Sequence, residues 1–462
     1  MSLQLAVSKS GAVGALAALL IAGTGVGSPA QAQVDLMNFE PSPQHLVMTR
    51  GAPNRQLLTA IEGAGGEVVF QHDLGIVFVR GLSDEAAANL SVVRGVTDVQ
   101  ADEWFAGDTS IESEALASSQ VFSPDDPAAA FFYPRQWHLQ AISAEPAWAA
   151  GRTGSSDVTV AILDTGIDYE HLDLQGRVDL SRSVSFVGID DFFTENLFPG
   201  RALIADLHFH GTHVAATAVS NGIVAAGVTS KPTLMGVKVC TFTDFSCSFA
   251  AVISGILHAV DNGADVVNLS LGGGFPKAGN GRFVGFINKV YNYARSNGAT
   301  MVVAAGNAAT DLDRNGNIFA SYCDAPGVIC VSATGPTDAD SVNGPWTNVD
   351  APAVYTNFGR SSITVAAPGG NTGGRVWAAC STTSLLISVC RTSPTFVVGV
   401  FGTSMATPHV SGLAALVVED VGRRPGRVKS AIQQGADDLG QRGTDKFYGK
   451  GRINVSRTLG LE

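Results

Sequence analysis

The sequence predicts an α/β fold in which a doubly wound, mostly parallel sheet follows a small α+β domain with one open sheet face. Two patterns support this fold class. Between residues 158 and 368, short apolar runs bounded by glycine or aspartate alternate with stretches of helical periodicity, the order expected of successive strand and helix units. Upstream, residues 45–102 change between strand and helix patterns every few residues. We therefore expect a small domain followed by a large one.

Composition narrows the function classes. Apolar residues make up 45% of the 462 residues and charged residues 15%, which excludes a globally disordered chain. The formal net charge is −12, so the chain lacks the basic excess typical of proteins that bind a nucleic-acid backbone. The 53 glycines favour tight turns over a helical bundle.

The first 32 residues predict a secretory signal peptide. Lys9 precedes an apolar run from residue 12 to 26, and the small residues Ala30 and Ala32 suit cleavage after Ala32. We expect a secreted, extracellular chain with no membrane attachment after cleavage. An uncleaved membrane anchor is the alternative, although the run is shorter than the roughly 20 residues that span a bilayer.

The six cysteines fall into three pairs of close neighbours in the sequence. Export to an oxidising compartment favours disulfides within these pairs, although six thiols allow fifteen connectivities. A zinc site is the alternative, and the absence of any CxxC spacing disfavours it. The expected pairs are Cys240 with Cys247, Cys323 with Cys330, and Cys380 with Cys390.

Each element of the small domain follows from its local pattern. The expected elements are a strand at 46–49, a helix at 54–64, a hairpin at 67–80, a helix from residue 83 and a strand at 96–99. This βαββαβ order predicts one sheet with an open face. Residues 107–130 have no periodicity and are rich in Ser, Ala, Asp and Glu, which predicts an exposed linker.

The large domain contains six short apolar runs of the kind that form strands buried on both faces. These runs are 158–163, 234–239, 265–271, 300–305, 327–333 and 363–368. The helical stretches are 213–220, 249–262, 283–296 and 404–419. In such sheets the reactive groups lie at the carboxyl ends of the strands.

Four side chains at strand or helix ends could together perform nucleophilic acyl transfer. Asp164 closes the first predicted strand, and Asn307 follows another. His210 and Ser404 stand where helices begin. The reaction needs a hydroxyl nucleophile, a base that takes its proton, a carboxylate that orients the base, and donors for the oxyanion.

The motifs around these residues, DTGID, HGTHVA, AAGN and GTSMATPHVSG, resemble those of the subtilisin-like serine proteases. The likeness extends from Trp137 to about Val455. It implies a serine endopeptidase that hydrolyses peptide bonds through an acyl-enzyme without a catalytic cofactor. By this resemblance Asp164 is the orienting carboxylate, His210 the general base, Ser404 the nucleophile, and Asn307 the oxyanion donor beside the backbone N–H of Ser404.

The resemblance also implies partners. Ser270, Leu271, Gly272 and Gly273 resemble the strand of this family that binds an extended peptide, so we expect protein or peptide substrates. We further expect a monomer that binds no nucleic acid. Two rival classes are a scaffold that does not cleave and an α/β-hydrolase esterase, but the esterase fold requires a G-x-S-x-G motif with its acid and histidine after the serine.

Residues 45–102 resemble the propeptide of the family, an intramolecular chaperone and inhibitor, which implies a self-processing zymogen. The expected domain organisation is a signal peptide at 1–32, a propeptide at 33–106, a linker with the maturation site at 107–130, and a catalytic domain at 131–462. The bond cut during maturation is expected between Glu103 and Pro127.

A structural calcium ion is one of two interpretations of residues 311–317. Asp311, Asp313, Asn315 and Asn317 place oxygen ligands at alternate positions around Gly316, like the first half of a calcium loop. A plain Asp/Asn/Gly turn is the other interpretation, since Tyr322 stands where the loop requires Glu. Asp173 matches a calcium ligand of the family, but the loop after His213 is shortened.

Several other residues carry expectations that the structure can test. We expect His208 to be exposed, and His213 and His409 to be buried structural residues. A zinc site at His208, His210 and His213 is an alternative that lacks the HExxH spacing. Asp168 is the alternative triad acid. We expect residues 190–193 to lie in an inserted surface loop, and the insertion between Cys380 and Cys390 to line the substrate cleft.

Overall fold

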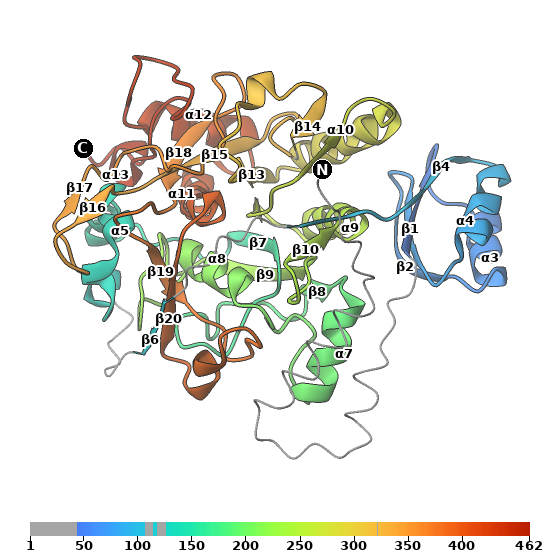
Figure 1. Cartoon of the computed structure of the whole chain (residues 1–462), viewed down its shortest axis with the longest axis horizontal. Helices are drawn as coiled ribbons and strands as arrows, with labels where there is room; N and C mark the ends of the chain where they lie inside the picture. Colours follow the sequence, from blue (N-terminus) through green and yellow to red (C-terminus); the bar gives the residue numbers. More distant parts are fainter. Residues whose placement is uncertain (1–43, 107–113, 118–125, 321) are drawn as a thin grey trace, which may run out of the picture.

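The computed structural model describes residues 44–106, 114–117, 126–320 and 322–462 (Figure 1). The predicted signal peptide lies outside these residues. The predicted fold class is confirmed, since a small antiparallel α+β domain precedes a seven-stranded parallel sheet with helices. Within the described residues, no helix is both long enough and apolar enough to span a bilayer.

The N-terminal domain has the predicted βαββαβ order. Its elements are β1 (Gln44–Thr49), α3 (Arg55–Gly63), β2 (Glu67–His72), β3 (Ile76–Arg80), α4 (Asp84–Asn89) and β4 (Val96–Ala101), with a 3-10 turn at Leu90–Val92. The four strands are antiparallel in the order β2-β3-β1-β4. On one face Val47 and Val77 pack against Leu57 and Ile61. The opposite face is not open to solvent, because it packs against the large domain beside α9 (Phe249–Asp261).

All six strands predicted for the large domain lie in one parallel sheet. Its order is β18 (Val365–Pro368), β15 (Ile329–Thr334), β13 (Thr300–Ala304), β11 (Val266–Leu269), β7 (Thr159–Asp164), β9 (Thr233–Lys238) and β8 (Val184–Ser185). The two-residue strand β8 was not predicted, because it is too short to show a periodic pattern.

Successive side chains of each strand point to opposite faces of the sheet and pack into two hydrophobic cores, one on each face. Val160 and Ile162 pack on the face covered by α8 (His210–Ala218), α11 (Thr403–Val421) and α12 (Pro425–Gly435). Ala161 and Leu163 pack on the other face, beneath α9 and α10 (Gly281–Ser296). This two-sided burial explains why the strands are apolar throughout.

The remaining elements surround these layers. They are α5 (Trp137–Ala141), α6 (Glu145–Ala149), α13 (Val455–Thr458), β12 (Gly274–Pro276), β14 (Ile318–Ala320), β16 (Asp338–Ala339), β17 (Trp346–Thr347), β19 (Val376–Ala379) and β20 (Phe396–Val400), with 3-10 turns at Pro127–Ala129, Tyr133–Arg135, Leu312–Arg314 and Ser388–Thr392.

Residues 190–193 do not form the surface loop that we expected. They belong to helix α7 (Gly188–Leu197), in which Asp190 and Phe193 are buried. Phe193 packs with Leu207, Phe242 and Leu385 from three other segments. These contacts come from distant parts of the chain, so the local sequence gave no indication of them.

Where the structure describes residues 107–130, part of the segment is regular and part is buried, which the prediction of an exposed segment without periodicity did not include. Strand β6 (Glu114–Ala117) pairs antiparallel with β20, and Pro127 is buried. Just upstream, β5 (Trp104–Ala106) pairs antiparallel with β10 (Ser246–Ser248). Both strands use partners more than a hundred residues away, so no local period reveals them.

The disulfide pairing is confirmed. The bonds join Cys240 to Cys247, Cys323 to Cys330 and Cys380 to Cys390, and they leave no thiol for zinc.

Candidate active site

Asp164 and His210 meet at the carboxyl edge of the parallel sheet. Asp164 ends strand β7, and His210 begins helix α8. The Nδ1 atom of His210 lies 2.7 Å from Oδ1 of Asp164, and both side chains are buried. An imidazole that donates from Nδ1 to a carboxylate keeps a lone pair on Nε2. This pair can therefore serve as an oriented general base.

Asp206 fixes the geometry of that pair, and sequence reasoning missed it. Its buried carboxylate accepts hydrogen bonds from Oγ1 of Thr165 at 2.9 Å and from Oγ1 of Thr212 at 2.6 Å. It also accepts the backbone N–H groups of His208, Phe209 and Thr212. One side chain thus ties the residue after Asp164 to the first turn of α8. No motif marks Asp206, because its donors come from two separate segments.

Ser404 lies in the first turn of α11, where backbone N–H groups have no partner within the helix. Its Oγ donates to the carbonyl oxygen of Ser270 at 2.9 Å, and Oγ of Ser270 donates to the carbonyl oxygen of Ser404 at 2.7 Å. The hydroxyl of Ser404 is therefore directed at Ser270. Hydrogen bonds between catalytic groups are often long or poorly aligned before the substrate binds, so this orientation is compatible with a role beside His210.

Asn307 lies beside Ser404. Its Oδ1 accepts the backbone N–H of Thr403 at 2.8 Å and the hydroxyl of Thr403 at 2.9 Å. With Oδ1 engaged in this way, the side chain presents its amide nitrogen to the start of α11, close to Gly402. The structure thus brings the predicted nucleophile and the predicted oxyanion donor together.

Aromatic rings enclose the predicted base. The ring of Phe245 lies 4.3 Å from that of His210 and 5.4 Å from that of His208. The Cys240–Cys247 disulfide closes the short loop that carries Phe245. The expectation that His208 is exposed is wrong, since only 2% of its surface is accessible. Burial lowers its pKa, and its Nδ1 accepts the backbone N–H of His210 at 3.3 Å.

The histidines expected to be structural are indeed buried, and a third histidine joins them. His138 on α5 accepts the backbone N–H of Trp377 through Nε2 at 3.4 Å, and its Nδ1 lies 2.8 Å from Nε2 of His409. Nδ1 of His409 donates to the carbonyl oxygen of Met405 at 2.8 Å. Burial lowers the pKa of His409 to about 4 and that of His213 to about 3. These rings are therefore neutral at physiological pH.

Sequence comparison identifies the family. The model of the Subtilase family matches residues 155–451, well over half of the chain. The chain belongs to the subtilase family. Thermitase of Thermoactinomyces vulgaris is 32% identical over 341 residues, which cover 73% of this chain and 99% of thermitase. Subtilisin DY of Bacillus licheniformis is 30% identical over 318 residues, which cover 68% of this chain and 94% of that protein. The protein is a subtilisin-like serine endopeptidase.

Solved structures agree on the fold. The epidermin leader peptide processing serine protease of Staphylococcus aureus matches with a TM-score of 0.68 at 19% identity, covering 91% of this chain and 99% of that one. The nisin leader peptidase of Lactococcus lactis matches with a TM-score of 0.55 at 20% identity, covering 72% of this chain and 95% of that one. At such identities the likeness concerns the fold alone.

In this subtilase β5 lies against the last residue of the predicted substrate strand. Ser270, Leu271, Gly272 and Gly273 lead from β11 to β12. A Cβ atom at Gly273 would lie 2.7 Å from Cδ2 of Phe105, so glycine there permits the close approach of β5. The Phe105 ring also lies 4.7 Å from that of Phe249.

The residues considered for calcium have other partners. The carboxylate of Asp313 accepts the backbone N–H and the hydroxyl of both Ser361 and Ser362, and Asp311 accepts the N–H of Asp313 at 3.1 Å. Asn315 and Asn317 continue the same turn. These donors fit the interpretation as a turn, and we do not propose calcium there.

The other metal and acid alternatives also fail on geometry. The carboxylate of Asp173 accepts three backbone N–H groups from residues 223–225, which leaves it poorly suited to a cation. Asp168 contacts Arg201 and Thr382 rather than His210. Within the described residues, no three His, Cys, Asp or Glu side chains are grouped to hold a metal ion, so the zinc alternative at His208, His210 and His213 is wrong.

Proposed function

We propose that this subtilase is a secreted endopeptidase that is made as a self-processing zymogen and uses Asp164, His210 and Ser404 as its catalytic triad. The observation that carries the assignment is the 2.7 Å hydrogen bond between the buried Asp164 and Nδ1 of His210. It leaves Nε2 as the basic atom at the sheet edge where α8 and α11 begin.

The proposed reaction follows from this arrangement. Nε2 of His210 takes the proton of the Ser404 hydroxyl as Oγ attacks the peptide carbonyl carbon, and Asp164 stabilises the imidazolium that forms. The amide of Asn307 and the backbone N–H of Ser404 stabilise the oxyanion. His210 then protonates the leaving amine, and water hydrolyses the acyl-enzyme by the same steps in reverse order. No metal takes part in these steps.

We assign residues 33–106 to a propeptide that inhibits the catalytic domain at 131–462. Support comes from its contacts beside the site. Strand β5 pairs with β10, and the carbonyl of Glu103 accepts the backbone N–H of Phe249 at 3.1 Å. The Asp102 carboxylate accepts the N–H of Ala250 at 2.9 Å and the hydroxyl of Ser248 at the start of α9. An extended segment bound in this way excludes a substrate from the same edge.

The maturation cut is proposed between Ala106 and Glu114, within the linker assigned to residues 107–130. Strand β5 lies against Gly273, next to the predicted substrate strand, whereas β6 pairs with β20, which runs into Gly402 and Ser404. Strands β5 and β6 thus lie next to the predicted substrate strand and next to the strand that leads to Ser404, which supports a cut between them.

Secretion is proposed on two grounds. The predicted signal peptide at 1–32 directs export, with cleavage after Ala32. The three disulfides are consistent with an oxidising destination.

The test compares the wild-type precursor with Ser404→Ala, both expressed from residue 1. Intact mass and N-terminal sequencing should show a wild-type chain that begins between Gly107 and Glu114, and a variant that retains residues from Gln33 onward. The variant should also be inactive on peptides. If the variant were processed and active like the wild type, the triad assignment would be wrong. If the two remained uncleaved while only the wild type hydrolysed peptides, self-processing alone would be refuted.

A further inference from the structure

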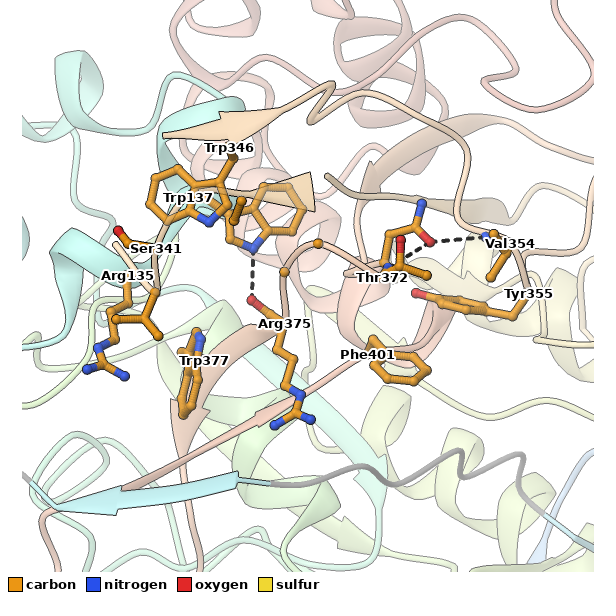
Figure 2. A pocket seen from close by; sticks show the side chains of 15 residues that line it. Arg135, Trp137, Ser341, Trp346, Val354, Tyr355, Thr372, Arg375, Trp377 and Phe401 are labelled. Carbon is orange, nitrogen blue, oxygen red and sulfur yellow. Dashed lines mark hydrogen bonds between the residues drawn. The ribbon is translucent and has the colours of Figure 1, made fainter. Parts of the chain in front are cut away.

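A pocket of about 710 Å³ beside Phe401 is lined largely by aromatic rings. Figure 2 shows that several of its polar groups bond to one another. Nε1 of Trp137 donates to the backbone carbonyl of Arg375 at 2.8 Å, and Oδ1 of Asn371 accepts the N–H of Thr372 at 3.0 Å. These bonds hold the wall together and do not select a ligand. A buried charge close to Asp164 is more informative, because its partners belong to the candidate active site.

That charge belongs to Lys238, the last residue of β9. Lys238 lies opposite Asp164, the last residue of β7, in the parallel pairing of the two strands. Its side chain has no exposed surface. A Cβ atom at Gly166 would lie 3.0 Å from its Cε, so the lysine stem passes against the turn that follows Asp164. Burial of an ammonium is costly unless its charge and its hydrogen bonds are compensated.

The hydrogen bond of this ammonium reaches the residue before Asp206. Nζ of Lys238 donates to the carbonyl oxygen of Ala205 at 2.6 Å. Because the peptide unit is planar, a shift of this carbonyl also shifts the Cα atom of Asp206. The carboxylate of Asp206 in turn accepts the hydroxyls of Thr165 and Thr212. The ammonium therefore holds the peptide group from which the fixed geometry of the candidate site extends.

Helix α7 compensates the charge. Oδ2 of Asp190 lies 3.7 Å from Nζ of Lys238, and both side chains are buried. Burial raises the pKa of Asp190 to about 7, although the ammonium lowers it. The carboxyl groups of Asp191 and Asp206 also lie close enough to raise this pKa. Asp190 is thus the counter-charge of Lys238, and it becomes neutral when the ammonium is removed.

We propose that Lys238 is a positioning residue for the reaction of this endopeptidase. Its ammonium holds the carbonyl of Ala205, and through Asp206 it keeps the imidazole of His210 aligned with Asp164. The proposal rests on the proposed function, because it takes these two residues as the base and its orienting carboxylate. Lys238 is fully buried, so its effect falls on the rate of the reaction rather than on peptide binding.

The test replaces Lys238 by methionine, which keeps an unbranched stem and removes the ammonium. Asp190 is then protonated, so the variant contains no unpaired buried charge at this place. With a peptide p-nitroanilide, kcat should fall by about 10- to 100-fold at unchanged KM, because a catalytic group displaced by about 1 Å can cost that much. Titration with an inhibitor that reacts with the active-site serine measures the concentration of active enzyme. It separates slower turnover from a smaller folded fraction.

A second measurement follows the pair of Asp164 and His210 directly. In the Ser404→Ala precursor, the proton on Nδ1 of His210 should give a low-field ¹H NMR signal, since this atom lies 2.7 Å from the carboxylate. Lys238→Met should move the signal to higher field, because displacement of Asp206 lengthens this hydrogen bond. A lysine that contributed only to packing would leave the signal unchanged.

Lys429→Met is the matched control. Nζ of Lys429 on α12 donates to the carbonyl oxygen of Val328 at 2.7 Å. This carbonyl precedes β15 and therefore lies at the amino end of the sheet, opposite the edge that carries the triad. The control should keep the wild-type kcat and the wild-type signal. If Lys238→Met does not fold, Lys238→Gln, which is also neutral and one bond shorter than lysine, should show the same two losses.

An unchanged kcat or an unchanged signal in the folded Lys238 variant would overturn the proposal. The proposed function has a separate test, because hydrolysis of the same p-nitroanilide by Ser404→Ala at the wild-type rate would refute the triad itself. The NMR signal does not depend on the nucleophile, so the two failures are distinguishable.

Discussion

At the scale of single residues, Asn307 is held in one orientation by its neighbour Thr403. Its Oδ1 accepts two hydrogen bonds from Thr403, which orients the amide. Its nitrogen lies on the other side, close to Gly402 and the start of α11. In the proposed mechanism, this orientation puts the donor in place before the oxyanion forms, which is what makes such a group effective in catalysis.

Asn307→Ala should lower kcat by about 10² to 10³ with little change in KM, the loss typical of removing one oxyanion-hole donor. The measurement is steady-state hydrolysis of a peptide substrate. Asn307→Asp keeps an acceptor for Thr403 but has no N–H, so it should lose at least as much activity as the alanine variant. Substantial activity in the aspartate variant would contradict the donor role.

At this scale, site residues could be predicted from the sequence when they stood within a continuous motif. Asp164, His210, Asn307 and Ser404 each stand in an unbroken motif, and the structure brings them to one edge of the sheet. Asp206 could not be found in this way. Its carboxylate accepts five hydrogen bonds from two separate segments, so no motif in the adjacent sequence marks it. His208 was misjudged for a similar reason, since the ring of Phe245 that covers it comes from another loop.

At the scale of elements, a buried chain of histidines joins α5 to α11 and to β19. The N–H of Trp377 points at His138, which in turn faces His409, and His409 donates to the carbonyl of Met405. Donors and acceptors match only when both rings are neutral, because a second proton on either ring would leave two donors facing each other. The position of α11 is thus linked to two uncharged histidines.

The free energy of unfolding of the Ser404→Ala protein should fall as pH is lowered from 6.5 towards 4. The folded pKa of His409 is about 4, depressed by burial from 6.5. The unfolded chain therefore takes up protons in this range that the folded chain cannot bind. His409 alone should contribute roughly 3 kcal/mol to this loss. Urea unfolding at several pH values measures how the free energy of unfolding changes with pH, which gives the number of protons taken up on unfolding. His409→Gln should reduce this number by about one. An identical slope in both proteins would refute this role.

Elements were predictable where burial imposed a local pattern. The six apolar runs became strands of one sheet because both of their faces are covered, and helices α9, α10 and α11 fell close to their predicted ranges. Strands β5 and β6 were missed because their partners β10 and β20 lie far away in the sequence. Helix α7 was missed because its apolar contacts belong to a cluster assembled from several segments.

At the scale of the whole molecule, the N-terminal domain and the catalytic domain share an interface that no single segment of the sequence predicts. The carboxyl group of Asp102 accepts the backbone N–H of Ala250 in the first turn of α9. His72 lies 3.0 Å from Asp261 at the other end of the same helix, and Nζ of Lys289 donates to the carbonyl of Leu74 at 2.6 Å. The division into domains could be predicted from the change in hydrophobic pattern along the sequence. The docking of the two domains could not, because it depends on contacts between distant residues.

Docking of the cleaved N-terminal domain should be tighter at pH 5 than at pH 7. Burial raises the pKa of Asp102 to about 6 in the docked state, from 3.8, so docking takes up a proton and weakens as pH rises through 6. The two values imply an affinity about tenfold higher at pH 5. Size-exclusion chromatography of the self-cleaved protein measures the fraction of N-terminal domain that co-elutes with the catalytic domain.

A variant that cannot ionise at residue 102 isolates the contribution of Asp102. Asp102→Asn keeps an oxygen acceptor for Ala250 but cannot ionise. The ratio of the docking affinity at pH 5 to that at pH 7 should be about tenfold smaller in this variant than in the wild type. If the asparagine variant showed the same pH dependence as the wild type, Asp102 would not be the group responsible.

The pairing of β5 with β10 and of β6 with β20 has a consequence for kinetics. In the proposed self-processing, the strands on both flanks of the cleaved bond pair with the same chain that carries Ser404. A cut made by Ser404 of that chain is a unimolecular event, and its half-time should not depend on dilution of the precursor.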